Sequence, residues 1–263
     1  MKHLHVTGCG RSGTTLLVEM LRSSFRHEGP AHHETSILEI PPRGLSVHIT
    51  KHPGEAAFLW PLLEADQDLY GIYVYRDPRS VICSVHAKAK DCYAVNFSSW
   101  KKQQKLAERA SRHPKLLVVC YEKLVTDPDA VQNDILQKFP FLELTGSFST
   151  YHERARPSSG AIQALNGFRA LDEARLQPWR HHLPRVKEQL NRHPEMADEL
   201  ITWGYEADRS WTGLLADVEV CSHEVWAERG LHLLKQLDQW QRRKRRLRKR
   251  IASDAKGARS GRE

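Results

Sequence analysis

Residues 6–17 join an apolar strand to an apolar helix through a glycine-rich turn. They read Val-Thr-Gly-Cys-Gly-Arg-Ser-Gly-Thr-Thr-Leu-Leu. The first N–H groups of a helix lack intrahelical partners, and the helix dipole favours negative charge there. The stretch therefore predicts a phosphate-binding loop. Thr14 stands where a nucleoside triphosphatase would carry its lysine, and the cation of this loop lies three places earlier, at Arg11.

Continuous apolar strands alternate with helical patterns along the first half of the chain. We expect buried strands at residues 4–7, 69–75 and 115–121, and a helix at residues 14–23. Such strands imply a parallel sheet with both faces covered. The predicted fold class is α/β, a P-loop-type three-layer α/β/α arrangement with a central parallel sheet.

The second half of the chain is expected to be a loop followed by helices. Residues 154–169 show no clear periodicity and predict a loop, whereas residues 176–205 predict helices. From residue 225 a basic amphipathic helix is expected, with an apolar seam interrupted by Lys244. Its seam is formed by Leu233, Leu237, Trp240, Leu247 and Ile251. We expect a domain at residues 1–215, a helical extension at 216–251 and a disordered tail at 252–263.

The net charge of +8 is concentrated at the end of the chain. Residues 242–263 hold eleven Lys and Arg against two acids, so the remainder carries about −1. A near-neutral body makes nucleic acid an unexpected partner for the whole protein. For the basic stretch Arg242–Arg250 four roles are open: a solvated helix, an anionic membrane surface, a polyanion, or a short dimer helix.

Cysteine usage and the start of the chain both predict a cytoplasmic protein. The five cysteines form no C-x-x-C pair, and their odd number favours reduced thiols. The phosphate loop is reached by residue 8, which leaves no room before it for a signal peptide or an anchor.

A second constellation follows the strand predicted at residues 69–75. It contains Arg76-Asp-Pro-Arg, then Ser84 and Lys88. A helix beginning near Pro78 would place Ser80, Ser84 and Lys88 on one face beside Arg76, where they would bind a phosphate. Ligands of parallel sheets sit beyond the carboxyl ends of strands, so two such sites suggest one ligand with two separated phosphates. The alternative is a charged turn with a helix cap.

Together these motifs resemble the sulfotransferases that use 3′-phosphoadenosine 5′-phosphosulfate (PAPS). Gly10–Thr15 resembles that family's 5′-phosphosulfate loop, and Arg76 with Ser84 its 3′-phosphate motif. Three further stretches match: His33-Glu-Thr, Lys51-His-Pro, and residues 119–128 around a tyrosine. The resemblance spans about residues 4–205. In motif spelling it is closest to protein-tyrosine and bacterial sulfotransferases.

The resemblance implies roles for individual residues. Glu34 would be the base for the acceptor hydroxyl, while Arg11 and Lys51 would stabilise the bridging oxygen and the sulfuryl group. The cofactor would be PAPS and the product adenosine 3′,5′-bisphosphate (PAP), without a metal. The residues expected to bind the cofactor are Gly10, Arg11, Ser12, Gly13, Thr14, Thr15, Arg76, Ser84, Lys88 and Tyr121, the last against adenine. The acceptor would be a hydroxyl of a sugar, lipid, small molecule or peptide tyrosine.

Several alternatives remain open at this point. Glu28, His32 and His33 are other possible bases. A last phosphate contact could come from one of four arginines, which are Arg154, Arg156, Arg169 and Arg175. Two other functions fit parts of the sequence. A P-loop kinase would share the loop, although Thr14 and Arg76 stand where it needs a lysine and a magnesium-binding aspartate; a binding protein would act through its basic tail.

Overall fold

Four parallel strands form the centre of the molecule. The computed structural model describes residues 1–42, 44–86, 89–220 and 241–252. The sheet order is β2-β1-β3-β6, with every neighbouring pair parallel. The strands are β1 (Lys2–Gly8), β2 (Val47–Lys51), β3 (Leu69–Tyr75) and β6 (Leu116–Cys120). The predicted α/β class with a central parallel sheet is confirmed.

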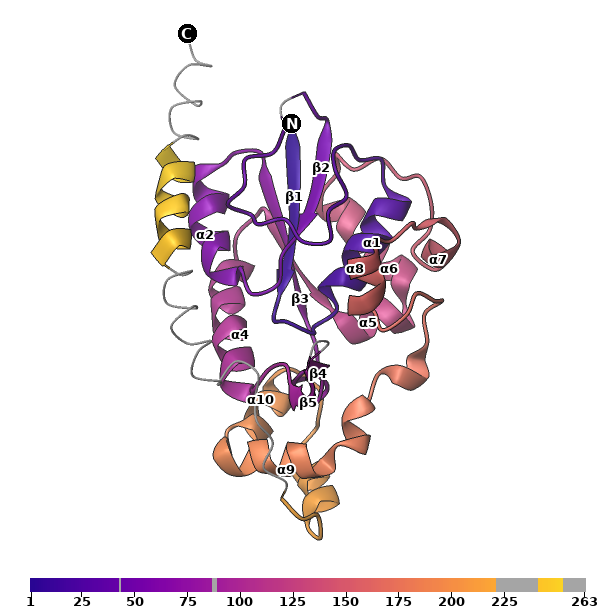
Figure 1. Cartoon of the computed structure of the whole chain (residues 1–263), viewed down its shortest axis with the longest axis vertical. Helices are drawn as coiled ribbons and strands as arrows, with labels where there is room; N and C mark the ends of the chain where they lie inside the picture. Colours follow the sequence, from indigo (N-terminus) through magenta and orange to yellow (C-terminus); the bar gives the residue numbers. More distant parts are fainter. Residues whose placement is uncertain (43, 87–88, 221–240, 253–263) are drawn as a thin grey trace.

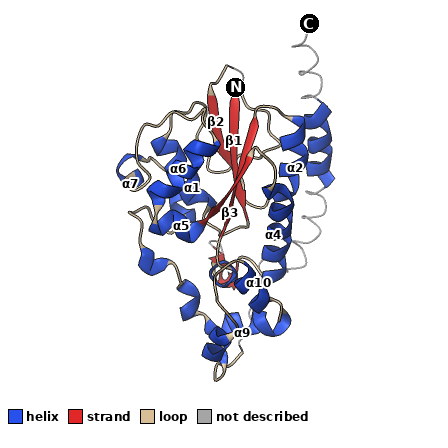
Figure 2. Cartoon of the chain, turned by 180° about the vertical axis from the view of Figure 1, so that it is seen from behind, coloured by secondary structure: helices blue, strands red, loops and turns tan. Residues whose placement is uncertain are grey.

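Helices cover both faces of this sheet, which gives the three layers seen in Figures 1 and 2. One face packs through Leu17, Met20 and Ile135, and the other through Leu59 and Leu63. The first layer contains α1 (Thr14–Ser24), α5 (Tyr121–Thr126) and α6 (Pro128–Lys138), and the second contains α2 (Ala56–Ala65) and α4 (Phe97–Ser111). The carboxyl ends of the strands are thereby left open for a site.

Strand β2 was not predicted. Its sequence, Val-His-Ile-Thr-Lys, alternates polar and apolar residues, a pattern typical of a half-buried strand, but every position is buried. The polar groups are paired in part inside the fold, although Nδ1 of His3 and Nε2 of His5 have no hydrogen-bond partner among the described residues. Nε2 of His3 and Nδ1 of His5 both hydrogen-bond Oγ1 of Thr50, at 2.7 and 2.8 Å. Buried polar side chains are tolerated when they are paired in this way.

A smaller helical part lies beyond the carboxyl ends of the strands. It packs around the buried residues Trp100, Trp179 and Leu200. Its elements are α3 (Pro78–Ile82), the hairpin β4 (Val85–His86) and β5 (Ala89–Tyr93), η1 (Glu173–Arg175), η2 (Pro178–His181), α9 (Leu183–Arg192), α10 (Met196–Thr202) and η3 (Ser210–Leu215). The helices predicted at residues 176–205 are present, as three pieces.

The loop predicted at residues 154–169 needs a correction. It follows α7 (Tyr151–Arg154) and contains α8 (Ser159–Ala164). The side chain of Ser158 caps α8 by accepting the N–H of Ala161 at 3.3 Å. A capped helix of six residues is too short to show a helical period in the sequence.

Residues 241–252 form a helix that lies beside α2 (Figure 1, yellow). Leu247 and Ile251 pack against the core under α2. The buried guanidinium of Arg250 donates to Oδ2 of Asp66 at 2.8 Å and to the carbonyl of Glu39 at 2.6 Å. The remaining predicted seam, Leu233, Leu237 and Trp240, and residues 253–263 lie outside the described residues, and the three-part domain division stays a prediction. None of the helices described is long and apolar enough to cross a membrane.

Candidate functional site

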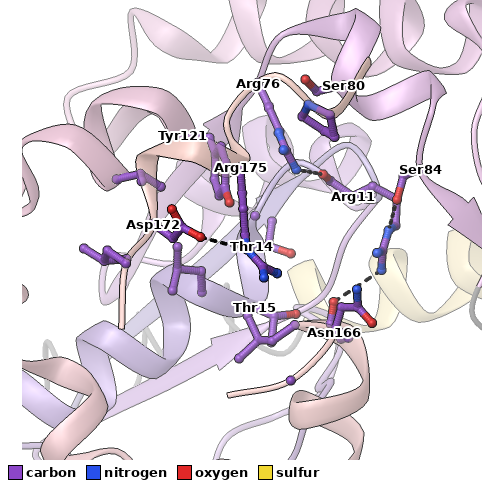
Figure 3. Close-up of a pocket in the computed structure, with 18 of the residues that line it drawn as sticks. Arg11, Thr14, Thr15, Arg76, Ser80, Ser84, Tyr121, Asn166, Asp172 and Arg175 are labelled. Carbon is purple, nitrogen blue, oxygen red and sulfur yellow. Dashed lines mark hydrogen bonds and ion pairs between the residues drawn. The ribbon is translucent and has the colours of Figure 1, made fainter. Parts of the chain in front are cut away.

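A cavity of about 570 Å³ lies at the carboxyl ends of the strands, and the predicted motifs meet in it (Figure 3). Residues from the phosphate loop, from the ends of β2 and β3, and from the start of α5 line it. Of the predicted site residues, those that line it are Gly10, Arg11, Gly13, Thr14, Thr15, Glu34, Lys51, Arg76, Ser84 and Tyr121. Segments far apart in sequence therefore share one site.

Two residues of the phosphate loop, one glycine and one arginine, have the left-handed backbone conformation. Gly13, the N-cap of α1, has φ 97°, and Arg11 has φ 71°. Because Gly13 has no side chain, the first N–H groups of α1 are not capped by it and can face an anion. The hydroxyl and the N–H of Ser12 both donate to the carbonyl of Cys9, at 2.7 and 3.1 Å, and the residue is fully buried. Ser12 does not line the cavity, so its contact with the cofactor stays a prediction.

Lys51 and Glu34 form an ion pair in the cavity. Nζ of Lys51 lies 3.2 Å from Oε1 of Glu34 and donates to Oγ1 of Thr15 at 3.1 Å. The lysine side chain is 1% exposed and the glutamate 41%. Burial lowers the pKa of Lys51, and the carboxylate of Glu34 opposes this shift. The pair places a cation against the phosphate loop and a carboxylate on the solvent side of it.

Glu34 is the one candidate base that lines the cavity among the four considered, all of which lie in the described residues. The carboxylate of Glu28 accepts the N–H of Ser46 instead, at 2.7 Å. Nε2 of His33 lies 3.8 Å from Oε1 of Glu34, and burial lowers the pKa of this histidine. His33 is therefore a neighbour of Glu34 and is mostly neutral at pH 7.

Arg11 and Arg76 approach each other at the phosphate loop. Nη1 of Arg76 donates to the carbonyl of Arg11 at 3.3 Å, and Nε of Arg11 donates to Oγ of Ser84 at 2.6 Å. Burial lowers the pKa of Arg11, and the charge of Arg76 lowers it further. Nε of Arg76 is buried without a hydrogen-bond partner in the described part of the chain. Two like charges and an unused donor favour an anion here.

The helix expected to carry Ser80, Ser84 and Lys88 on one face needs a correction. Helix α3 ends at Ile82, and the carbonyl of Ser84 accepts the N–H of Ala94 at 2.8 Å, so the chain continues into the β4-β5 hairpin. The hydroxyl of Ser80 donates to the carbonyl of Leu176. Ser84 still reaches the cavity, but from this hairpin, and Lys88 lies outside the described residues.

Tyr121 begins α5 immediately after β6, and its ring packs against the phosphate loop. The guanidinium carbon of Arg76 lies 4.2 Å from the ring centroid. A Cβ added to Gly13 would lie 2.1 Å from a ring carbon, so this close approach requires glycine. Tyr121 thereby holds Arg76 beside the loop, and its predicted contact with adenine stays a prediction.

The four arginines considered for a last phosphate contact divide into two groups. Arg169 and Arg175 line the cavity, whereas Arg154 donates to the carbonyl of Ser23 at 2.6 Å and Arg156 to that of Ala155 at 3.0 Å. Nε of Arg175 is paired with Oδ2 of Asp172 at 2.9 Å.

The sequence analysis missed several lining residues, among them the polar residues Asn166, Asp172 and His181. The Asn-Gly pair at residues 166–167 was a signal for a turn, with φ 55° at Asn166, but nothing in its spacing placed it at this site.

Comparisons with known proteins give the following results. No family model matches the sequence, and no curated protein matches it. Among solved structures, the sulfotransferase domain of the Synechococcus PCC 7002 olefin synthase is similar, at 15% identity and a TM-score of 0.47, over 68% of this chain and 87% of that one. Retinol dehydratase, solved with androsterone and the inactive cofactor PAP, is similar at 15% identity and a TM-score of 0.32, over 97% of this chain and 81% of that one.

Proposed function

We propose that this protein transfers a sulfuryl group from PAPS to a hydroxyl of an acceptor. The observation that carries the proposal is the cationic lining of the cavity. Arg11, Arg76 and Arg169 line it without an ion-pair partner among the described residues, whereas Lys51 is paired with Glu34 and Arg175 with Asp172. Excess positive charge around a phosphate loop suits a ligand with more than one anionic group.

The donor set suits the two ends of such a nucleotide. The N–H groups at the start of α1, with the hydroxyls of Thr14 and Thr15, would hold the 5′ end. The buried and unpartnered Nε of Arg76, with Ser84, would hold the 3′-phosphate. When bound, PAPS supplies the sulfuryl group and a phosphate leaving group.

The remaining groups suit the transfer of a proton and the stabilisation of charge. Glu34, which is 41% exposed, can accept the proton of a hydroxyl that arrives from solvent. Lys51 and Arg11 can stabilise the negative charge that grows on the leaving oxygen, because both are held by hydrogen bonds before the reaction begins. The acceptor we propose is therefore a hydroxyl of a sugar, lipid, small molecule or peptide tyrosine.

The test is transfer of radioactive sulfate from labelled PAPS to components of a cell extract, with a chelator present. We expect a labelled product with the wild-type protein and at least about 100-fold slower labelling with Glu34→Gln. A parallel reaction with γ-labelled ATP and magnesium tests the kinase alternative. Label from ATP, with none from PAPS, would overturn the proposal.

A further inference from the structure

The segment that carries Glu34 is bound by a buried carboxylate that lies outside the cavity. Glu34 itself is 41% exposed, and its side chain contacts Lys51 at 3.2 Å and His33 at 3.8 Å. The position of its backbone depends on its neighbours in the chain. On the preceding side the carbonyl of His32 accepts from Nη1 of Arg22 at 3.2 Å. The N–H of Thr35 donates to the carbonyl of Lys51 at 2.9 Å, which ties the base directly to the strand that carries the lysine.

The next two residues are bound by Glu55. Oγ of Ser36 donates to Oε1 of Glu55 at 2.6 Å, and the N–H of Ile37 donates to Oε2 at 2.8 Å. Ile37 then enters the core, where it is fully buried. Each carboxylate oxygen thus holds one residue of the segment, and such charge-assisted bonds fix geometry more strongly than neutral ones.

Glu55 is itself fixed in place. It precedes α2, its side chain is 0% exposed, and its N–H donates to Oγ1 of Thr7 at 3.2 Å. Oγ1 of Thr7 in turn donates to the carbonyl of His52, the residue after Lys51, at 2.8 Å. Glu55 does not line the cavity, so it acts on a bound molecule only through other residues.

A buried carboxylate is costly unless donors surround it, and the donors of Glu55 come from the segment that follows Glu34. The nearest histidine, His5, has Nε2 3.5 Å from Oε2 of Glu55, but burial lowers the pKa of His5 well below its usual value. A neutral His5 leaves the two bonds from Ser36 and Ile37 as the main polar contacts of Glu55 with the segment.

We propose that Glu55 is a positioning residue for the base: through Ser36 and Ile37 it sets the distance between Glu34 and Lys51. The proposal rests on the function proposed above. It predicts that losing this contact harms the proton-accepting step while leaving the nucleotide subsites intact, because Glu55 touches neither the phosphate loop cavity nor Arg76.

Ser36→Ala is the main test, since it leaves the carboxylate and the core in place. It removes the bond to Glu55 and a longer one, 3.3 Å, in which Oγ of Ser36 accepts the N–H of Leu38. We expect kcat to fall about 10- to 100-fold, the loss typical of a misplaced catalytic group, with the KM for PAPS and the Kd for PAP unchanged. Ser36→Thr, which keeps the hydroxyl, should restore most of kcat. Ser24→Ala is the control, because it also removes a buried hydroxyl. That hydroxyl donates to the carbonyl of Ser147 and not to the segment that carries Glu34.

A double-mutant cycle separates positioning from general structural damage. If Ser36 acts through Glu34, adding Ser36→Ala to Glu34→Gln should leave the residual single-turnover rate unchanged. A structural role would lower the rate by the same factor in both backgrounds, and that result would overturn the proposal. An unchanged kcat in Ser36→Ala alone would overturn it as well.

Amide hydrogen exchange gives a readout that needs no activity. The N–H of Ile37 should exchange faster in Glu55→Gln, and in Ser36→Ala to a smaller degree, while the amides of α1 keep their protection. Equal protection of the Ile37 N–H in all variants would contradict the proposed role of Glu55. A wild-type protein that binds PAP but transfers no sulfuryl group would instead contradict the proposed function, and with it the positioning role of Glu55.

Discussion

Nζ of Lys51 lies 3.2 Å from Oε1 of Glu34 and 3.1 Å from Oγ1 of Thr15, so one buried ammonium joins the carboxylate of Glu34 to the helix that follows the phosphate loop. The arrangement gives each partner a separate task. In the proposed reaction Lys51 would face the growing negative charge, and Glu34 would face the solvent side from which a hydroxyl approaches. Removing either charge should therefore affect the chemical step more than the binding of the nucleotide.

Activity should be lost at a lower alkaline pH than the ordinary pKa of a lysine would predict. Burial lowers the pKa of Lys51 below 10.5, so its positive charge is lost at a lower pH than in the unfolded chain. The rate should fall as pH rises through that lowered value. Lys51→Arg, whose guanidinium keeps its charge, should remove this limb at a reduced maximal rate. The measurement is a pH profile of kcat; an identical alkaline limb in both proteins argues against Lys51.

Arg11→Ala should reduce turnover by about 100- to 1000-fold, because it removes a preorganised donor without removing core volume. The Oγ of Ser84 would lose its partner but could turn to water or to a bound phosphate. Thermal unfolding should stay within a few degrees of the wild type. Arg26→Ala is the matched control, because Arg26 is exposed and paired with Glu143 at 3.0 Å. Near-normal turnover of Arg11→Ala would remove Arg11 from the mechanism.

Arg76 should decide whether the protein recognises the 3′-phosphate. Arg76→Ala is expected to weaken the binding of PAP about 10- to 100-fold, the value of a charge-assisted hydrogen bond to a phosphate. The binding of adenosine 5′-phosphate, which lacks that group, should change much less. Titration of both nucleotides into both proteins measures the difference. Equal losses for the two nucleotides would place Arg76 at the 5′ end instead.

The exposed cations of residues 241–252 should attract anionic surfaces. Leu247 and Arg250 face the body, whereas Arg245, Arg246, Arg248 and Lys249 are exposed. Each basic residue near an anionic membrane contributes about 1 kcal/mol, a gain that salt screens. Replacing these four by Gln should lower sedimentation with phosphatidylglycerol vesicles at least about tenfold, with no change for neutral vesicles. If the wild type and the variant bind anionic vesicles equally, these four residues do not form a membrane-binding surface.

Local sequence patterns predicted the centre of the site well. The strand, glycine turn and helix around Gly10–Thr15 are fixed by local chemistry, and buried apolar strands such as β3 imply parallel pairing. Because parallel strands end at one edge, Arg76 could be expected near the loop from its place after a predicted strand. Lys51 was expected at the site from the family resemblance alone, since β2 was not predicted.

Other features depended on contacts between distant segments. Ser84 reaches the cavity because its carbonyl pairs with the N–H of Ala94, a hairpin contact that overrides the helical spacing. The pairing of Arg175 with Asp172 lies in a segment without periodicity. Glu55 looks in sequence like an ordinary residue at the start of a helix. Its role depends on Ser36, which only the fold brings to it.

Calorimetric titration of the wild-type protein with PAP, in a chelator, tests the central claim most directly. Two cationic subsites on one cavity predict one molecule bound per chain, with clearly higher affinity than for adenosine 5′-phosphate and an affinity that falls as salt is raised. A folded protein that gives no heat of binding with PAP, or that binds both nucleotides equally, would contradict the account.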